Sequence, residues 1–239
     1  MPDLSVTMTI GDIVGHDLRT AAVFAHYGID FCCGGRRSLD DACKAKGVDS
    51  SDVLRDLVAL EATDNAEDMT SWGVDALVEY IVTRHHAYVK RQVPAITLML
   101  ETLVAAHGER YPALPRMVTT FASLSSELIH HLEKEERILF PYIQSMATQH
   151  RDGSRALPTP FGTVRNPIRM MEDDHQQAAA DLWMLRVLSN GFTVPEDGCV
   201  TWRACFSELA AFEHDLHQHV HLENNVLFPK AARLEDELS

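Results

Sequence analysis

The chain has 239 residues, 46% of them hydrophobic, and carries a net charge of −14 at pH 7. This length and composition allow one large domain, or a medium domain with a small one, around a substantial core. The acidic balance argues against a nucleic-acid or acidic-membrane partner, and no apolar run of about 18 residues predicts a membrane span.

Residues 1–66 are predicted to form a small helical domain. Short helical patterns alternate there with glycine-containing turns, and Ser38 and either Ser50 or Ser51 are plausible N-caps. The polar stretch 63–71 that follows is expected to be a linker.

Two adjacent cysteines, Cys32 and Cys33, lie in the segment YGIDFCCGG of this domain. A disulfide between sequence neighbours is strained, so we expect no simple structural bridge. The two thiols are candidates for metal binding, oxidation or attack on a modified sulfur, and the flanking glycines favour their exposure and reactivity. The alternative is that both are small, half-buried residues in a turn. Three other cysteines are expected to pack in the interior: Cys43, Cys199 and Cys205.

An odd number of cysteines, five, does not form a disulfide framework, and the N-terminus has no recognisable secretory signal. Both features favour a reducing cytoplasm as the location of the protein.

Four longer amphipathic patterns predict a four-helix bundle over residues 72–232. The stretches between them are rich in glycine and proline, and Pro94 should bend the first helix. The final ten residues are expected to be a solvated end. The four helices are expected at residues 72–106, 115–147, 163–190 and 198–228.

The second and fourth of these helices repeat one local sequence at an offset of 88 residues. HLEKEERILFP begins at His131 and HVHLENNVLFP begins at His219, and each has glutamate four places after its first histidine. His86 and His175 relate the first and third helices in the same way. The bundle is therefore expected to consist of two similar helical hairpins, in which each Leu-Phe-Pro packs and then bends or ends its helix.

The repeated polar residues occupy helix positions at which the pattern demands apolar side chains. Core-facing positions alternate in steps of three and four, and the second helix places Leu128, His131, Glu135 and Ile138 on one such stripe. In the first helix His86 continues the alternation, whereas the preceding residue, His85, would break it. Six polar residues are thus predicted to point inward: His86, His131, Glu135, His175, His219 and Glu223.

A pair of metal ions explains why two carboxylates and four imidazoles face the interior. A single His-x-x-x-Glu pair is more often found on a surface, but burying two unpartnered carboxylates would be very costly. Residues four apart share one helix face, so each pair can address a common point. Nitrogen and oxygen ligands without thiolate suit iron or manganese, with zinc as a further option, and the two glutamates are natural bridges.

The other polar residues near these helix positions are expected to have no ligand role. Glu133 and Glu136 are interpreted as surface charges that could tune the site. Three histidines of the fourth helix lie off its buried stripe and are expected to be solvated or to lie behind the ligands: His214, His217 and His221.

These motifs resemble the family of iron–sulfur cluster repair di-iron proteins. The histidines and His-x-x-x-Glu pairs on four helices, with EKEERILFP and LENNVLFP, match its hemerythrin-like domain, and YGIDFCCGGRRSLDDAC resembles the small domain that precedes it. The resemblance implies an all-α fold, a hemerythrin-like up-down four-helix bundle preceded by a small helical domain. It also implies two non-haem iron ions, carboxylate- and oxo-bridged, held by His86, His131, Glu135, His175, His219 and Glu223.

The resemblance further implies repair of iron–sulfur clusters damaged by nitric oxide or oxidative stress, through iron donation, nitric oxide handling or both. Nitric oxide or oxygen would be the small ligand, damaged iron–sulfur proteins the partners, and an electron donor and a second copy of the chain are candidate partners. Two alternatives use the same centre: a nitric-oxide-binding sink or sensor, and a nitric oxide reductase. Whether the protein is an enzyme stays open at this point.

Overall fold

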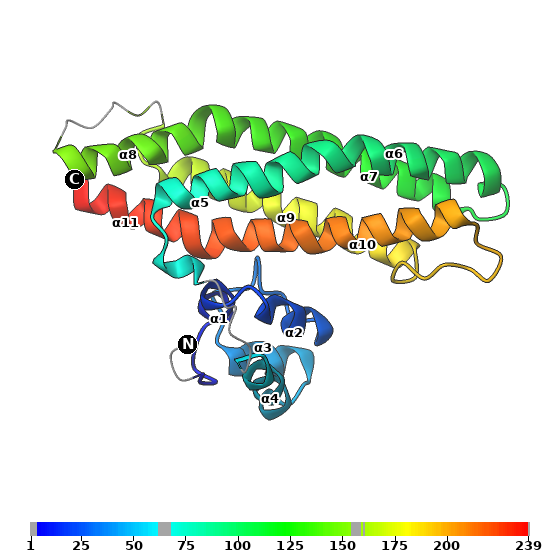
Figure 1. Cartoon of the computed structure of the whole chain (residues 1–239), viewed down its shortest axis with the longest axis horizontal. Coiled ribbons are helices and arrows are strands. Elements are labelled where there is room, and N and C mark those ends of the chain that lie inside the picture. Colours follow the sequence, from blue (N-terminus) through cyan, green and yellow to red (C-terminus); the bar gives the residue numbers. More distant parts are fainter. Residues whose placement is uncertain (1–3, 62–67, 154–158, 160, 239) are drawn as a thin grey trace. The chain divides into compact units, whose positions relative to one another are not determined.

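The computed structural model describes residues 4–61, 68–153, 159 and 161–238, and all its regular elements are helices (Figure 1). Within these ranges the sole sheet-like pairing is an isolated bridge between Thr9 and Ser38. The prediction of an all-α protein is therefore confirmed. Most of the expected linker, residues 63–67, lies outside the described residues.

The chain divides into two compact units, which are described separately. One contains residues 1–81, 141–168 and 217–239, and the other contains residues 82–140 and 169–216. These units do not coincide with the expected domains 1–66 and 72–232, so the domain boundaries stay a prediction.

Three of the four N-terminal helices of the first unit begin at side-chain caps, and α2 is the exception. The hydroxyl of Ser38 accepts the backbone N–H of Asp41 at 3.1 Å, as expected for an N-cap. The last helix of this group is preceded instead by Asp49, whose carboxylate accepts the N–H of Ser51 at 2.8 Å. The cap is therefore neither of the two serines expected. The four helices are α1 (Ile10–His16), α2 (Thr20–His26), α3 (Leu39–Lys46) and α4 (Ser50–Glu61).

These short helices enclose a small apolar core in the first unit. Ile13, Phe24, Leu39 and Leu57 have no exposed surface. Helix α1 also packs against two turns of the same unit, η1 (Met69–Ser71) and η4 (Leu222–Leu227). The loop that carries the adjacent cysteines lies between α2 and α3.

Four long helical runs supply the rest of the fold, close to the predicted ranges. In the second unit, α6 and α7 pack against each other as a hairpin (Figure 1), and α6 continues through Pro94 without interruption. The first run comprises α5 (Val74–Tyr80), η2 (Ile81–His86) and α6 (Ala87–His107). The second comprises α7 (Ala113–Lys134), η3 (Glu135–Leu139) and α8 (Phe140–Asp152). The third is α9 (Arg165–Leu188), and the fourth comprises α10 (Val200–His221), η4 (Leu222–Leu227) and α11 (Phe228–Leu238).

The repeated Leu-Phe-Pro segments do not end their helices. A wide turn precedes each proline: Phe140 N–H bonds to the carbonyl of Glu135, and Phe228 N–H to that of Glu223. Hydrogen bonds from residue i to residue i−5 define a π-turn, which adds one residue to the helical turn. The helix continues beyond both prolines, so the tail expected to be a solvated end is α11 instead.

The π-turn also corrects one predicted core position. Ile138 was expected on the buried stripe, but half of it is exposed, and Leu139 is buried in its place. The additional residue in η3 rotates all later residues relative to a regular α-helix, which shifts the core-facing position by one.

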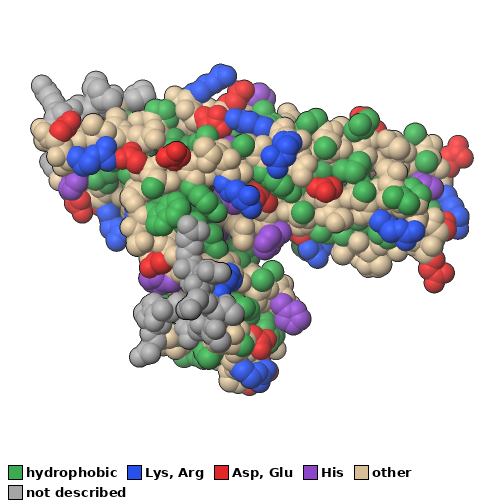
Figure 2. All heavy atoms as spheres, in the orientation of Figure 1, with side chains coloured by type: hydrophobic (Ala, Val, Ile, Leu, Met, Phe, Trp, Pro, Cys, Tyr) green, Lys and Arg blue, Asp and Glu red, His purple; other side chains and the backbone are tan. Residues whose placement is uncertain are grey.

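None of the described helices combines the length and apolar composition that a membrane crossing requires. On the face seen in Figure 2, basic and acidic side chains are interspersed rather than gathered into separate patches.

Candidate metal centre

Three of the predicted inward-facing histidines surround Glu135 in the second unit. Glu135 is the first residue of η3 and is fully buried. Its Oε2 lies 3.5 Å from Nε2 of His86 and 3.3 Å from Nε2 of His131. The Nε2 atom of His175 lies 3.0 Å from that of His131. The structure thus directs the Nε2 atoms of residues from three helical runs toward one buried carboxylate.

The second His-x-x-x-Glu pair lies at the repeated position in the first unit. His219 lies near the C-terminal end of α10, and Glu223 lies in η4. Nε2 of His219 and Oε1 of Glu223 are 2.8 Å apart, and neither side chain is exposed. Both glutamates of the repeat therefore lie in π-turns, one helical turn after their histidine.

The potential ligand atoms form two groups, each with all its members within 4.8 Å of one another. One group contains His86, Glu135, His219 and Glu223, and the other contains His131, Glu135, His175 and Glu223. The two groups share both glutamates.

The surroundings of Glu135 fit a cation. Among the described residues, neither of its carboxylate oxygens accepts a hydrogen bond. A fully buried carboxylate without donors is strongly destabilising, whereas a bound cation compensates its charge. Two imidazoles and two carboxylates per group, with no thiolate, suit iron, manganese or zinc.

Two acidic residues lie behind the histidine rings and orient them. Nδ1 of His86 lies 2.8 Å from Oε1 of Glu136, and Nδ1 of His131 lies 3.3 Å from Oδ2 of Asp174. A carboxylate at Nδ1 favours the tautomer with hydrogen on Nδ1, which leaves the Nε2 lone pair for a metal.

Both outer carboxylates also bind a lysine. Lys90 donates to Glu136 at 2.6 and 2.8 Å, and Lys134 donates to Asp174 at 2.9 Å. Burial opposes ionisation of Glu136, but the hydrogen bonds of Lys90 and His86 outweigh it and lower its pKa. The hydrogen bond with His131, aided by Lys134, lowers the pKa of Asp174 to about 2.

From the sequence, Glu136 is interpreted as a surface charge that could tune the site, and Asp174 is not identified. Glu136 belongs to the same helical run as Glu135, which was a usable signal. Asp174 contacts His131, which lies 43 positions earlier in the chain. The position of Asp174 next to His175 in the sequence therefore does not predict this contact.

The neighbouring histidines differ in their environments. His85 is buried, and its Nδ1 lies 3.1 Å from Asp215. His214 is exposed, as expected. His221 is fully buried, which excludes the solvated one of its two expected placements, and its Nδ1 lies 3.3 Å from the carbonyl oxygen of Phe31. Burial lowers the pKa of His221 to about 4.

The adjacent cysteines are free thiols in different environments. Cys32 is buried and Cys33 is half-buried, and their Sγ atoms are 3.9 Å apart. The contact with Cys33, burial and the charge of Asp30 raise the pKa of Cys32 well above its ordinary value. Cys32 is therefore not exposed as expected, and the reactivity of the pair stays a prediction.

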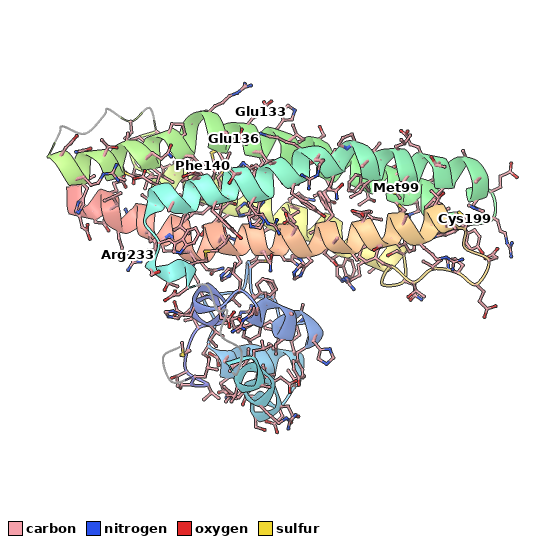
Figure 3. All side chains as sticks on the ribbon, viewed as in Figure 1. Met99, Glu133, Glu136, Phe140, Cys199 and Arg233 are labelled. Atoms are coloured by element: carbon pink, nitrogen blue, oxygen red, sulfur yellow. The ribbon has the colours of Figure 1, made fainter. Side chains whose placement is uncertain are left out.

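The three remaining cysteines are also free. Cys43 and Cys205 are buried, as expected for packing residues, and burial raises the pKa of Cys205 to about 12. Cys199 is half-buried and precedes α10 (Figure 3).

Comparison with protein families matches both parts of the chain. The family model described as "Hemerythrin HHE cation binding domain" matches residues 77–231. The model described as "Domain of Unknown function (DUF542)" matches residues 6–61.

Several curated proteins are similar over most of the chain. A protein of Haemophilus influenzae named "Probable iron-sulfur cluster repair protein" is 35% identical over 87% of this chain and 89% of its own length. The "Iron-sulfur cluster repair protein YtfE" of Yersinia pestis is 34% identical over 90% of this chain and 92% of its own. The protein of the same name from Musicola paradisiaca is 31% identical over 94% and 96%, respectively. With these relatives and a family model that covers more than half of it, the chain belongs to the iron–sulfur cluster repair proteins that carry a hemerythrin HHE cation-binding domain.

Proposed function

We propose that this protein is a di-iron protein that repairs iron–sulfur clusters damaged by nitric oxide or oxidative stress. The observation that carries the proposal is the pair of buried ligand groups that share Glu135 and Glu223. It is supported by the hemerythrin HHE match and by relatives named as iron–sulfur cluster repair proteins. In this proposal His86, His131, His175 and His219 hold two iron ions together with the two glutamates.

When bound, iron supplies redox change and affinity for small ligands such as nitric oxide or oxygen. The chain's own residues preorganise the site. Glu136 and Asp174 orient the rings of His86 and His131, and the buried glutamates supply negative charge. Within the described part of the chain, no hydrogen-bond donor competes for Glu135. Each group contains four protein ligands, which leaves coordination positions for an exogenous ligand.

Damaged iron–sulfur proteins are the proposed partners, with an electron donor and self-association into a homodimer as further elements. The proposal includes a cytoplasmic location, for which the five free thiols are the support. Glu135 and Glu223 belong to both ligand groups and would hold both ions, which is compatible with iron donation and with nitric oxide handling.

The decisive experiment uses an enzyme whose [4Fe–4S] cluster has been damaged by nitric oxide. The iron-loaded protein is added anaerobically, and recovery of the enzyme's activity is compared with that produced by an equal amount of free ferrous iron. We expect greater recovery with the protein, and none beyond the free-iron control with His86→Ala. Equal recovery with protein and free iron would contradict repair.

The same mixture distinguishes repair from the two alternative functions, which the open coordination positions also favour. Nitrous oxide release without enzyme recovery would identify a nitric oxide reductase. Retention of nitric oxide with neither product nor recovery would identify a sink or sensor.

A further inference from the structure

The loop between α2 and α3 contains three potential metal ligands that are separate from the histidine and glutamate groups. These are Asp30, Cys32 and Cys33, and their donor atoms all lie within 4.8 Å of one another. Sγ of Cys32 lies 3.3 Å from Oδ1 of Asp30 and 3.9 Å from Sγ of Cys33. Two sulfurs and one oxygen form a softer donor set than the nitrogens and oxygens of the other groups.

The distances are close to those of a tetrahedral site. Two thiolates bound at the usual zinc–sulfur distance are about 3.8 Å apart, and a thiolate and a carboxylate oxygen are about 3.6 Å apart. The observed 3.9 and 3.3 Å differ from these values by about 0.1 and about 0.3 Å, and the third pair, Asp30 and Cys33, has its donor atoms within 4.8 Å. Small side-chain adjustments therefore suffice to bring the three atoms around one ion.

The loop backbone is held in place by contacts that leave both sulfurs available. Oδ1 of Asp30 accepts the N–H groups of Cys32 at 3.1 Å and Cys33 at 2.9 Å. From the other side, Nδ2 of Asn225 donates to the carbonyls of Phe31 at 3.3 Å and Cys32 at 2.9 Å. A loop fixed before binding loses little conformational freedom when the ion arrives.

Burial and exposure within the loop also suit a metal site with one open side. Cys32 is buried, whereas Cys33 is half-buried and Asp30 is exposed. An ion can enter from the side of Asp30 and Cys33, and water can complete its coordination there.

We propose that Asp30, Cys32 and Cys33 form a second metal site that binds one thiolate-preferring divalent cation, Zn²⁺ or Fe²⁺. Each binding event replaces two S–H bonds with two metal–sulfur bonds and releases two protons to the solvent, with no change of oxidation state. The site does not depend on the proposed repair function. Within that function, it would offer a place where iron can bind outside the histidine and glutamate centre.

Cobalt(II) is the probe for the test, because its thiolate complexes absorb strongly through sulfur-to-metal charge transfer. The reduced full-length protein, with its histidine and glutamate centre preloaded with iron, is titrated anaerobically. We expect a charge-transfer band that saturates at about one equivalent of cobalt. Zinc and ferrous iron are then added in parallel, and the ion that abolishes the band at the lower concentration is the preferred one.

Matched variants assign the ligands. Cys33→Ser and the double variant Cys32→Ser/Cys33→Ser should lose the band, whereas Cys199→Ser, which alters another half-buried thiol, should keep it. Asp30→Asn keeps an oxygen that can accept both loop N–H groups but removes the charge, so cobalt affinity should fall roughly tenfold or more. Circular dichroism and the iron content of the other centre confirm that each variant is folded.

Three results would overturn the proposal. The first is the absence of a thiolate band in the reduced protein, and the second is a band that persists in the double variant. The third is an unchanged cobalt affinity in Asp30→Asn, which would show that the carboxylate is not a ligand. All three are independent of the cluster-repair assay, so a failure here and a failure of the proposed function are distinguishable.

Discussion

The side-chain amide of Asn225 donates a 2.9 Å hydrogen bond to the backbone carbonyl of Cys32. Asn225 follows Glu223 by two residues in η4, so this bond joins the cysteine loop to the turn that carries a proposed iron ligand. Two glycines make room for the asparagine. A Cβ atom added to Gly35 would lie 2.3 Å from Oδ1 of Asn225, and one added to Gly11 would lie 2.8 Å from it.

The internal repeat differs at the positions that make this contact. At the 88-residue offset, His221, Asn224 and Asn225 correspond to Glu133, Glu136 and Arg137, whereas the ligands and the Leu-Phe-Pro are identical. All three residues of the later copy lie within hydrogen-bonding distance of the carbonyls of Phe31 or Cys32. The repeat has therefore diverged where one copy supports the cysteine loop.

This contact predicts a compensating pair of substitutions. Gly35→Ala should destabilise the protein by about 1–3 kcal/mol, because the new methyl group overlaps the side chain of Asn225. In an Asn225→Ala background the same change should cost much less, since the overlapping atoms are gone. Denaturant unfolding of the single and double variants measures the coupling. Arg137→Ala, at the repeated position, is the control, and equal costs of Gly35→Ala in both backgrounds would refute the steric account.

Adjacent histidines should have opposite effects on metal content. His86→Ala should lose iron, because Nε2 of His86 faces Glu135. His85→Ala should keep iron but lower the unfolding temperature, because this buried ring pairs with Asp215. Metal analysis and thermal unfolding of both variants provide the test. The same iron content in the two proteins would show that the ligand has been misassigned.

The sharing of glutamates predicts different stoichiometries for two ligand variants. The wild-type protein should hold about two irons per chain, as the two groups imply. Glu135→Ala should lose both, since this carboxylate belongs to both groups, whereas His131→Ala should retain about one. Iron is quantified after anaerobic reconstitution. A wild-type value at or below one would contradict the dinuclear centre.

The carboxylate behind His86 should influence metal affinity without touching the metal. Glu136→Gln should weaken iron binding roughly 10- to 100-fold, because the amide no longer supports the imidazole tautomer as a charged partner. Glu133→Gln is the matched control: Figure 3 shows both residues on the same helical run, and the side chain of Glu133 is 46% exposed. Competition with a chelator gives the two affinities, and indistinguishable values would assign Glu136 to surface charge alone.

The vicinal thiols should matter for repair but not for the histidine and glutamate centre. Cys32→Ser/Cys33→Ser should keep the optical spectrum of that centre, because neither group includes a cysteine. Recovery of a nitric-oxide-damaged enzyme should decrease if the cysteine loop takes part in transfer. Full recovery with the double variant would restrict Cys32 and Cys33 to packing in the turn.

The sequence was sufficient for the features that depend on local periodicity. The helix ranges and the inward direction of His131, Glu135, His219 and Glu223 follow from the 3.6-residue repeat, and the structure buries all four residues. The similarity between the two helical hairpins also follows from the sequence, because the repeated segments can be read directly from it.

The tertiary structure decided what depends on hydrogen bonds and packing between distant residues. Periodicity assumed uniform α-helical turns, so it placed Ile138 in the core, whereas the π-turn at Glu135 buries Leu139 instead. The pairing of Asp174 with His131 joins two helical runs, and the burial of His221 arises from the loop that carries Phe31 and Cys32. No local pattern encodes these contacts, because each depends on how segments far apart in the chain pack together.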